Sequence, residues 1–295
     1  MTQIKDYLVS FVLLYYKDYD NTIKCIESIL SLDNTRYKTT IVLVDNCSQD
    51  NAFERFKELY KNQDNIFYIT NKKNLGFARG NNVGISYAVK TLKSDFVIAI
   101  NTDTIINQID FCNKIVEIYE KKHFDVLGPR VKGYVSDNDQ SPIYADYDQD
   151  TRKKIIKDGI KWFFWKIHIG GLIEKKQNLN VVKPNNKKIN RYRCVCSGCC
   201  LVFSPHFFER WKGFYPGTFL YREESILFYI INRVGGKTYF AEEIVIKHKG
   251  GESTSKEFGK NDRKRNLRIY SNRLESLKKE LQLKKLNVED LSKEI

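Results

Sequence analysis

"SDFVIAINTDTII", residues 94–106, is an apolar run that stops at Asn-Thr-Asp-Thr and then becomes apolar again. Its segment 96–100 is short, apolar and rich in β-branched residues, which is typical of a strand buried on both faces. Asp103 follows that strand directly. A carboxylate in this position either caps a turn or holds a positive group, and the remainder of the chain has to distinguish the two.

Strand and helix signals alternate through the first hundred residues. Strands are predicted at 7–16, 39–46, 65–70 and 96–100, and helices at 19–32, 48–62 and 80–92. This order predicts an α/β fold with a Rossmann-like, mostly parallel sheet flanked by helices. Ligands of such sheets bind beyond the carboxyl ends of the strands, so Asp45 and Asp103 are expected at the same edge.

The second part of the chain is less regular. It predicts a helix and strand within 111–127, a loop at 134–150, a strand at 193–204, helices at 205–211 and 226–236, a strand at 238–251 and a charged helical tail at 261–295. Three parts follow from this pattern: 1–110, 111–255 and 256–295.

The chain has 295 residues, 42% of them hydrophobic, which is ordinary for a globular protein. No apolar run approaches the ~18 residues that span a bilayer, and the N-terminus lacks a signal-peptide cleavage pattern, so a cytoplasmic chain is expected. Seven cysteines include Cys194, Cys196, Cys199 and Cys200. A zinc site is conceivable, but a buried strand with free thiols is the favoured interpretation.

The formal charge of +14 is concentrated in one segment. Residues 152–193 contain thirteen Lys and Arg against two acidic residues, a net charge of +11. Such a concentration indicates an anionic partner: a membrane, a nucleic acid or a phosphorylated substrate.

Four motifs resemble, in order, those of the inverting family-2 glycosyltransferases with the GT-A fold, most closely the bacterial rhamnosyltransferase-type branch. They are "VLVDNCSQD" (42–50), "NKKNLGFARGNNVGI" (71–85), "AINTDTII" (99–106) and "GTFLYREESILFYIINRVGGKTYFAEEIVIKHKGGEST" (217–254). The resemblance implies a nucleotide-sugar-binding half at 1–110 and an acceptor-binding, catalytic-base half at 111–255. The basic tail, 256–295, is not covered.

The resemblance also implies a dTDP- or UDP-sugar donor. Asp45 would meet the nucleobase or ribose, although a turn cap explains it equally well. Glycines of the second motif allow close backbone approach, and its arginine suits a phosphate or base. The implied donor-binding residues are Asp45, Asn74, Gly76, Arg79, Gly80, Asn81, Asn101 and Thr102.

Metal ligands are implied at Asp103 and His248. A carboxylate, an imidazole and diphosphate oxygens suit Mg²⁺ or Mn²⁺. Each residue also has an ordinary structural explanation: a strand-end turn for Asp103 and a satisfied structural histidine for His248.

The resemblance implies that the catalytic base is one of the two adjacent glutamates, Glu223 and Glu224. A carboxylate that is buried beside another carboxylate is tuned toward the basicity a general base needs. Glu224 is the first choice by position and Glu223 the second. The motif departs from the family twice: it has Glu where Asp is commoner, and Ile226 where a further acid is expected.

A membrane surface is a predicted partner. Trp162 to Trp165, flanked by Lys161 and Lys166, resemble an interfacial anchor, and the tail forms a second candidate surface helix. Contact with a membrane would suit an enzyme at the inner face of the cell membrane. Its acceptor would be a lipid-linked saccharide of capsule or O-antigen synthesis. The alternative is a core element with solvated lysines.

Three other functions are alternatives to a glycosyltransferase. A nucleic-acid-binding protein fits the charge, but no recognition motif is present, so no nucleic-acid partner is expected. A dinucleotide-dependent oxidoreductase needs glycines in the first strand-helix turn, "YYKDYDN", which has none. An inactive transferase-like partner subunit remains open because of Asn101 and Ile226.

Overall fold

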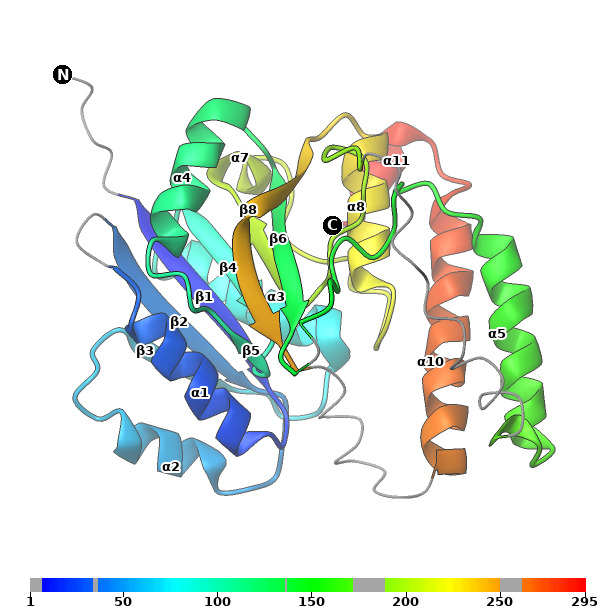
Figure 1. The fold of residues 1–295 in the computed structure, drawn as a ribbon, viewed down its shortest axis with the longest axis horizontal. Coiled ribbons are helices and arrows are strands. Elements are labelled where there is room, and N and C mark those ends of the chain that lie inside the picture. The colour runs from blue at the N-terminus through cyan, green and yellow to red at the C-terminus, as the bar shows by residue number, and fades with distance from the viewer. Residues whose placement is uncertain (1–6, 34–36, 136, 172–188, 250–261) are drawn as a thin grey trace.

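The computed structural model describes residues 7–33, 37–135, 137–171, 189–249 and 262–295. Its first part alternates strictly between strands and helices (Figure 1). The elements are β1 (Leu8–Tyr15), α1 (Tyr19–Leu30), β2 (Lys38–Asp45), α2 (Ala52–Leu59), β3 (Ile66–Thr70), α3 (Gly76–Lys90) and β4 (Phe96–Ile100). All seven elements predicted for this part are present.

The second part adds four strands and the helices around the site. Its elements are β5 (Thr104–Ile105), α4 (Phe111–Lys122), β6 (Val126–Gly133), α5 (Thr151–Lys166), β7 (Cys200–Phe203), α7 (Pro205–Phe208), α8 (Glu223–Arg233), β8 (Thr238–His248), α10 (Asp262–Leu283) and α11 (Val288–Ser292). The predicted strand 193–204 is wrong over its first part, because residues 191–193 and 198–199 form turns and only 200–203 are in a strand. Helix α8 begins three residues earlier than predicted.

One eight-stranded sheet joins both parts in the order β3-β2-β1-β4-β7-β6-β8-β5. Strands β1, β2, β3 and β4 pair in parallel, whereas β7 and β5 are antiparallel to their neighbours. The predicted α/β fold with a mostly parallel sheet is therefore confirmed. In the short β5–β8 pairing, Thr104 is opposite His248, which brings Asp103 close to that histidine.

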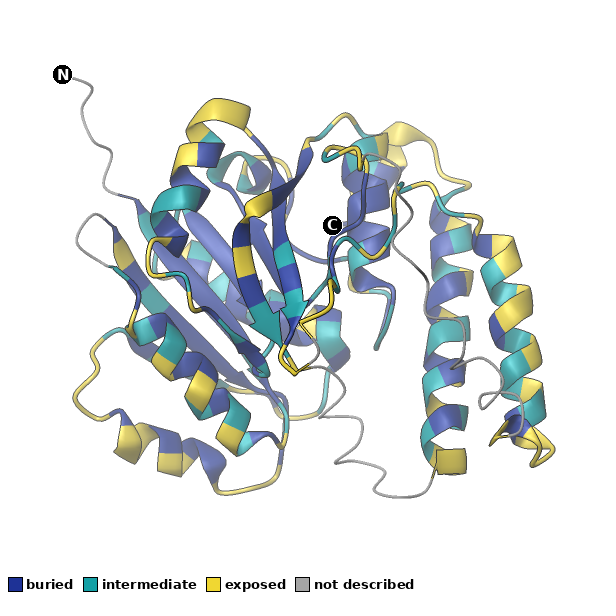
Figure 2. Ribbon diagram, in the orientation of Figure 1, coloured by how far each residue is buried: buried dark blue, intermediate teal, exposed yellow. Residues whose placement is uncertain are grey.

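Two hydrophobic layers cover the faces of the sheet. Alternate residues of β1 point to opposite sides: Phe11 and Leu13 pack with α1, α2 and α4, and Val12 packs with α3 and α8. Figure 2 shows β1 and β4 buried along most of their length. Each fully buried side chain of this kind contributes roughly 1.5–3 kcal/mol, so the sheet is a rigid support for the loops at its edge.

The C-terminal tail is part of the fold. Helix α10 packs beside α5, as Figure 1 shows. Arg273 of α10 donates two hydrogen bonds, of 2.9 and 3.1 Å, to the buried carboxylate of Asp158. The hydroxyl of Thr151 donates a 2.7 Å bond to the buried Glu280. Helix α10, predicted as part of a charged helical tail, is thus joined to α5 by buried polar contacts.

No helix within the described ranges has the length and apolar character required to cross a bilayer. All seven cysteines are free thiols, and six of them are buried. Among the described residues, no three His, Cys, Asp or Glu side chains gather as they would around a metal ion. The structure thus favours packed thiols over a zinc site for Cys196 and Cys199.

Candidate active site

A cavity of ≈370 Å³ lies where the ends of β4 and β8 meet the loop before α8 and the helix α10. Its walls come from seven separate parts of the chain. They are formed by Phe77, Asn101, Ile143, Tyr144, Ser197, Gly198, Cys199, Leu220, Tyr221, Arg222, Glu223, Glu224, His248 and Arg273. Four residues predicted for the site, Asn101, Glu223, Glu224 and His248, are therefore brought together.

Glu223 and Glu224 begin helix α8, where the helix dipole favours negative charge. Glu223 is 3% exposed, and Glu224 is partly open to the cavity. Burial and the neighbouring Glu224 carboxylate raise the pKa of Glu223 to about 8. Burial also raises the pKa of Glu224, an effect opposed by the nearby Arg222 guanidinium. With this pKa, Glu223 is mostly protonated at neutral pH.

The backbone before α8 has an unusual conformation. Tyr221 and Arg222 both have positive φ, of 75° and 74°. Consecutive non-glycine residues in this region are uncommon and persist only where the surroundings enforce them. This turn directs the following two glutamates into the cavity.

Arg222 is held by a buried network. Its Nη2 and Nε lie 2.7 and 2.9 Å from Glu280 of α10, and its Nη1 donates a 3.0 Å bond to the hydroxyl of Tyr144. Both members of the ion pair are almost fully buried, at 6% and 1% exposure. No local sequence pattern indicates this pair, because 58 residues separate its members.

The loop 197–199 closes the cavity beside the glutamates. A Cβ on Gly198 would stand 3.2 Å from Oε2 of Glu224, so the absence of a side chain leaves space for that carboxylate. Sequence reasoning treated "CVCSGCC" as a buried strand and missed this contact. The glycine within the cysteine cluster was the available signal.

His248 lines the cavity and contacts Asp103, which is not itself one of the lining residues. Nε2 of His248 is 3.2 Å from Oδ1 of Asp103, and its Nδ1 is 2.8 Å from Oε1 of Gln140. Asp103 is 12% and His248 14% exposed. A carboxylate and an imidazole this close fit one divalent ion whose remaining ligands are water and phosphate oxygens. Residues 250–254, the end of the fourth motif, lie outside the described residues.

The residues next to Asp103 have different surroundings. The backbone of Asn101 donates a 2.8 Å bond to the carbonyl of Cys199, which leaves its side chain on the cavity wall. Thr102 is 6% exposed and does not line the cavity.

The second motif joins the start of α3 to the loop before α8. Gly76 has φ +79°, and a Cβ there would be 2.3 Å from the carbonyl oxygen of Phe219. The next residue, Phe77, donates a 2.7 Å backbone bond to that same oxygen. The side chain of Asn74 accepts bonds from Gly76 and Asn46, which fixes the turn before α3.

Three more residues of this motif have structural contacts. Nε of Arg79 donates a 2.7 Å bond to the carbonyl of Pro216, and the side chain of Asn81 bonds to the carbonyl of Phe77 within α3. Gly80 lets α3 lie against Leu14 of β1. None of these three lines the cavity.

Asp45 ends strand β2 and has a local hydrogen-bond partner. Its Oδ1 accepts a 2.8 Å bond from the backbone of Ser48. It is 9% exposed and does not line the cavity. The turn-cap interpretation therefore accounts for its position.

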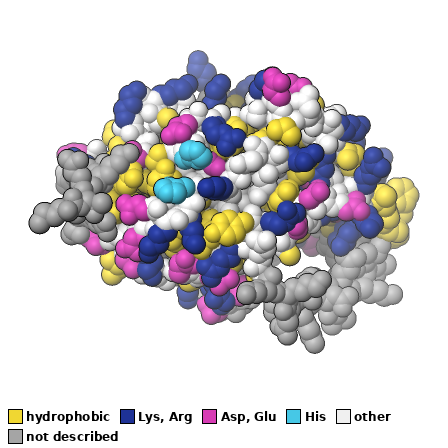
Figure 3. All heavy atoms as spheres, turned by 90° about the horizontal axis from the view of Figure 1, so that it is seen from above, with side chains coloured by type: hydrophobic (Ala, Val, Ile, Leu, Met, Phe, Trp, Pro, Cys, Tyr) yellow, Lys and Arg dark blue, Asp and Glu magenta, His cyan; other side chains and the backbone are white. Residues whose placement is uncertain are grey.

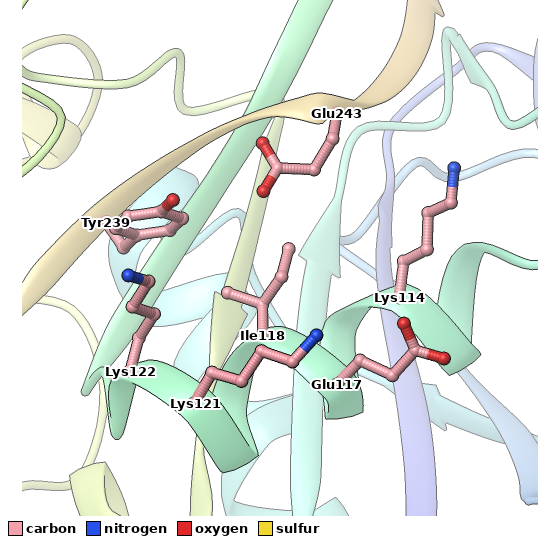
Figure 4. A pocket seen from close by; sticks show the side chains of 7 residues that line it. All are labelled: Lys114, Glu117, Ile118, Lys121, Lys122, Tyr239 and Glu243. Carbon is pink, nitrogen blue, oxygen red and sulfur yellow. The ribbon is translucent and has the colours of Figure 1, made fainter.

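A second cavity, of ≈220 Å³, lies between α4 and β8 (Figure 4). It is lined by Lys114, Glu117, Ile118, Lys121, Lys122, Tyr239 and Glu243. None of the predicted site residues belongs to it, so it offers surface positions for control substitutions.

Solved structures share this fold at low sequence identity. GalNAc-T7 with UDP, GalNAc and Mn²⁺ is 14% identical with a TM-score of 0.58, covering 82% of this chain and 43% of its own. The mannosyltransferase PcManGT of Pyrobaculum calidifontis, with GDP-Man and Mn²⁺, is 11% identical with a TM-score of 0.55, covering 90% and 69%. TarS of S. aureus with UDP is 14% identical with a TM-score of 0.52, covering 91% and 72%. These similarities establish a GT-A type fold.

A sequence relative is the low-salt glycan biosynthesis hexosyltransferase Agl10 of Haloferax volcanii. It is 28% identical over 131 residues, which are 38% of this chain and 41% of that protein, so the match spans less than half of the relative. The family model for glycosyl transferase family 2 matches residues 10–180, more than half of the 295 residues. The chain therefore belongs to glycosyl transferase family 2.

Proposed function

We propose that this glycosyltransferase moves a hexosyl or rhamnosyl unit from a nucleoside diphosphate sugar to a hydroxyl of a glycan, with inversion. The observation that supports this most strongly is the shared cavity. Asn101 and His248 line it on the side of the β4 and β8 ends, and Glu223 and Glu224 line it on the side of α8. A sugar between these two sides would have its diphosphate and its attacking hydroxyl on opposite faces.

Glu224 is the proposed general base. Its partly open carboxylate takes the proton of the acceptor hydroxyl while that oxygen forms a bond to the anomeric carbon. The bond from the anomeric carbon to the diphosphate breaks at the opposite face, and the diphosphate leaves with its electron pair. Glu223, whose pKa is raised to about 8, stays protonated at neutral pH and so limits the negative charge near Glu224.

Asp103 and His248 would hold Mg²⁺ or Mn²⁺. When bound, such an ion neutralises the charge that develops on the leaving diphosphate. The proposal is supported by the 3.2 Å approach of the two side chains and by the Mn²⁺ in the complexes of GalNAc-T7 and PcManGT.

The donor, acceptor and location are further parts of the proposal. The UDP complexes of structural relatives support a UDP- or dTDP-sugar donor held by the half 1–110, although GDP-Man in PcManGT marks an alternative. The acceptor would be a lipid-linked saccharide of bacterial surface-polysaccharide synthesis, such as capsule or O-antigen, bound by the half 111–255. The protein would act peripherally at the inner face of the cell membrane. The name of the Haloferax relative supports a role in glycan assembly.

The test is a panel of UDP-, dTDP- and GDP-sugars, assayed for transfer or donor hydrolysis with and without Mn²⁺. In the active combination, Glu224→Gln and Asp103→Ala are each expected to lower kcat by about 100-fold or more while the protein stays folded. Glu117→Gln, in the second cavity, is the matched control and should keep full activity. Full activity of Glu224→Gln would exclude it as the base, and inactivity with every donor would contradict the proposed function.

A further inference from the structure

Helix α5 carries an exposed hydrophobic stripe. Ile156, Ile160, Phe163 and Ile167 are 63%, 52%, 52% and 44% exposed. Their spacings of four, three and four residues place the first three on one side of the helix and Ile167 at its C-cap in line with them. Such a contiguous apolar surface on a soluble helix indicates an interaction site.

The stripe lies opposite the face of α5 that packs on the protein. Asp158 and Trp165 are buried on that inner face, where Asp158 binds Arg273 of α10. With 100° of rotation per residue, these two residues lie on the far side of the helix from Ile160 and Phe163. The described part of α10 therefore does not cover the stripe.

This surface differs from the one predicted from the aromatic block. Trp165 is only 8% exposed, and a Cβ on Gly170 would meet its ring, so Trp165 is a packing residue. Trp162 and Phe164 are partly buried. Of the four aromatic residues, only Phe163 belongs to the exposed stripe.

Positive side chains flank the stripe. Arg152, Lys153, Lys157 and Lys166 are all exposed on α5. The only acidic residue within α5 is Asp158, which is buried against Arg273. In Figure 3, hydrophobic side chains appear at the edge of the molecule on the side of α5, next to Lys and Arg. An apolar stripe with a basic rim is complementary to a bilayer that contains anionic lipids.

We propose that α5 lies on the surface of an anionic membrane, with Ile156, Ile160, Phe163 and Ile167 inserted at the boundary between headgroups and acyl chains. This inference rests on the proposed peripheral role of the transferase and assigns its contact surface. Arg273 lines the catalytic cavity and also binds Asp158 on the inner face of α5. The docked helix is thus attached directly to a wall of the active site.

The experiment is co-sedimentation of the full chain with phosphatidylcholine vesicles, with and without phosphatidylglycerol. Binding to the anionic vesicles is expected to fall about tenfold or more in the double variant Ile160→Glu/Phe163→Glu, because it removes apolar contact and adds repulsion. The double variant Lys153→Gln/Lys157→Gln should reduce only the additional binding that phosphatidylglycerol provides. Leu59→Glu, a 53% exposed position on α2, is the matched control and should bind normally.

Vesicle binding that is unchanged in the double variant would overturn the proposal. So would a wild-type dimer that dissociates in the double variant without any vesicle binding, because the stripe would then contact a second copy. Circular dichroism verifies that each variant is folded. Donor hydrolysis without vesicles should be equal in wild type and double variant, so a failure of lipid binding is separable from a failure of the proposed transfer reaction.

Discussion

The two sides of the active site hold their polar side chains in different ways. On the β1–β4 side, Asp45 and Asn74 bond to backbone groups two or three residues away. On the α8 side, Glu224 lies beside Arg222, whose partner Glu280 comes from a distant helix. Local turn chemistry thus builds the edge at the end of β2 and the start of α3, whereas long-range burial of charge builds the edge that carries the proposed base.

The largest effect on stability is expected at the buried ion pair. Glu280→Gln leaves the buried Arg222 guanidinium without its ion-pair partner, which costs about 3–5 kcal/mol in the free energy of unfolding. Asp45→Asn retains an oxygen that can accept the Ser48 bond and should cost less than about 1 kcal/mol. Chemical denaturation measures both. Equal losses of unfolding free energy in Glu280→Gln and Asp45→Asn would show that the two edges are stabilised in the same way.

A control on the same helix isolates the burial of the charge. Glu275 is exposed on α10, so Glu275→Gln should change stability by about 0.5 kcal/mol or less. A large loss of unfolding free energy in Glu275→Gln would mean that the effect of Glu280→Gln comes from changing helix α10 in general and not from the buried charge.

The next effect is expected where the two edges touch. Gly76→Ala should destabilise the protein by about 2–4 kcal/mol, because the new Cβ meets the Phe219 carbonyl and the residue has positive φ. Gly159→Ala is the matched substitution inside α5, where a Cβ meets nothing within 4 Å. It should stabilise by about 0.5–1 kcal/mol. Thermal unfolding distinguishes them, and a neutral Gly76→Ala would mean that the contact is not required.

The smallest effect depends on pH. The pKa of Glu223 is raised to about 8 in the folded chain, against an ordinary value of 4.5. The folded state therefore binds more protons than the unfolded state between these values, and stability falls as pH rises from about 4.5 to 8. Glu223→Gln should remove this decline and gain on the order of 1–3 kcal/mol over wild type at pH 9, with little change at pH 4. Parallel stability curves for the two proteins would contradict the buried-proton interpretation.

The sequence was sufficient for the first half of the fold because its signals are local. The apolar runs at β2 and β4 end in polar residues, and the intervening helices have clear periodicity. The α8 motif also located Glu223 and Glu224, which the structure brings onto one cavity with Asn101 and His248.

The remainder depended on contacts between distant residues. Arg273 and Asp158 are 115 positions apart, and Thr151 and Glu280 are 129 apart, so no window of sequence contains either pair. The cysteine-rich segment was predicted as one strand because its residues are small and apolar. In the structure, this segment turns at 198–199, where Gly198 lies next to Glu224 and the carbonyl of Cys199 accepts a bond from the Asn101 backbone.

The contact of Gly76 and Phe77 with the Phe219 carbonyl has a consequence for engineering donor preference. The stretch 71–85 and the loop preceding α8 are therefore expected to function as a unit, since a transplanted 71–85 stretch has to meet a matching carbonyl in that loop. A graft that transfers donor preference between relatives should therefore include both stretches, 71–85 and 213–224. A graft of either stretch alone is expected to misplace the acidic pair even when the sugar nucleotide still binds.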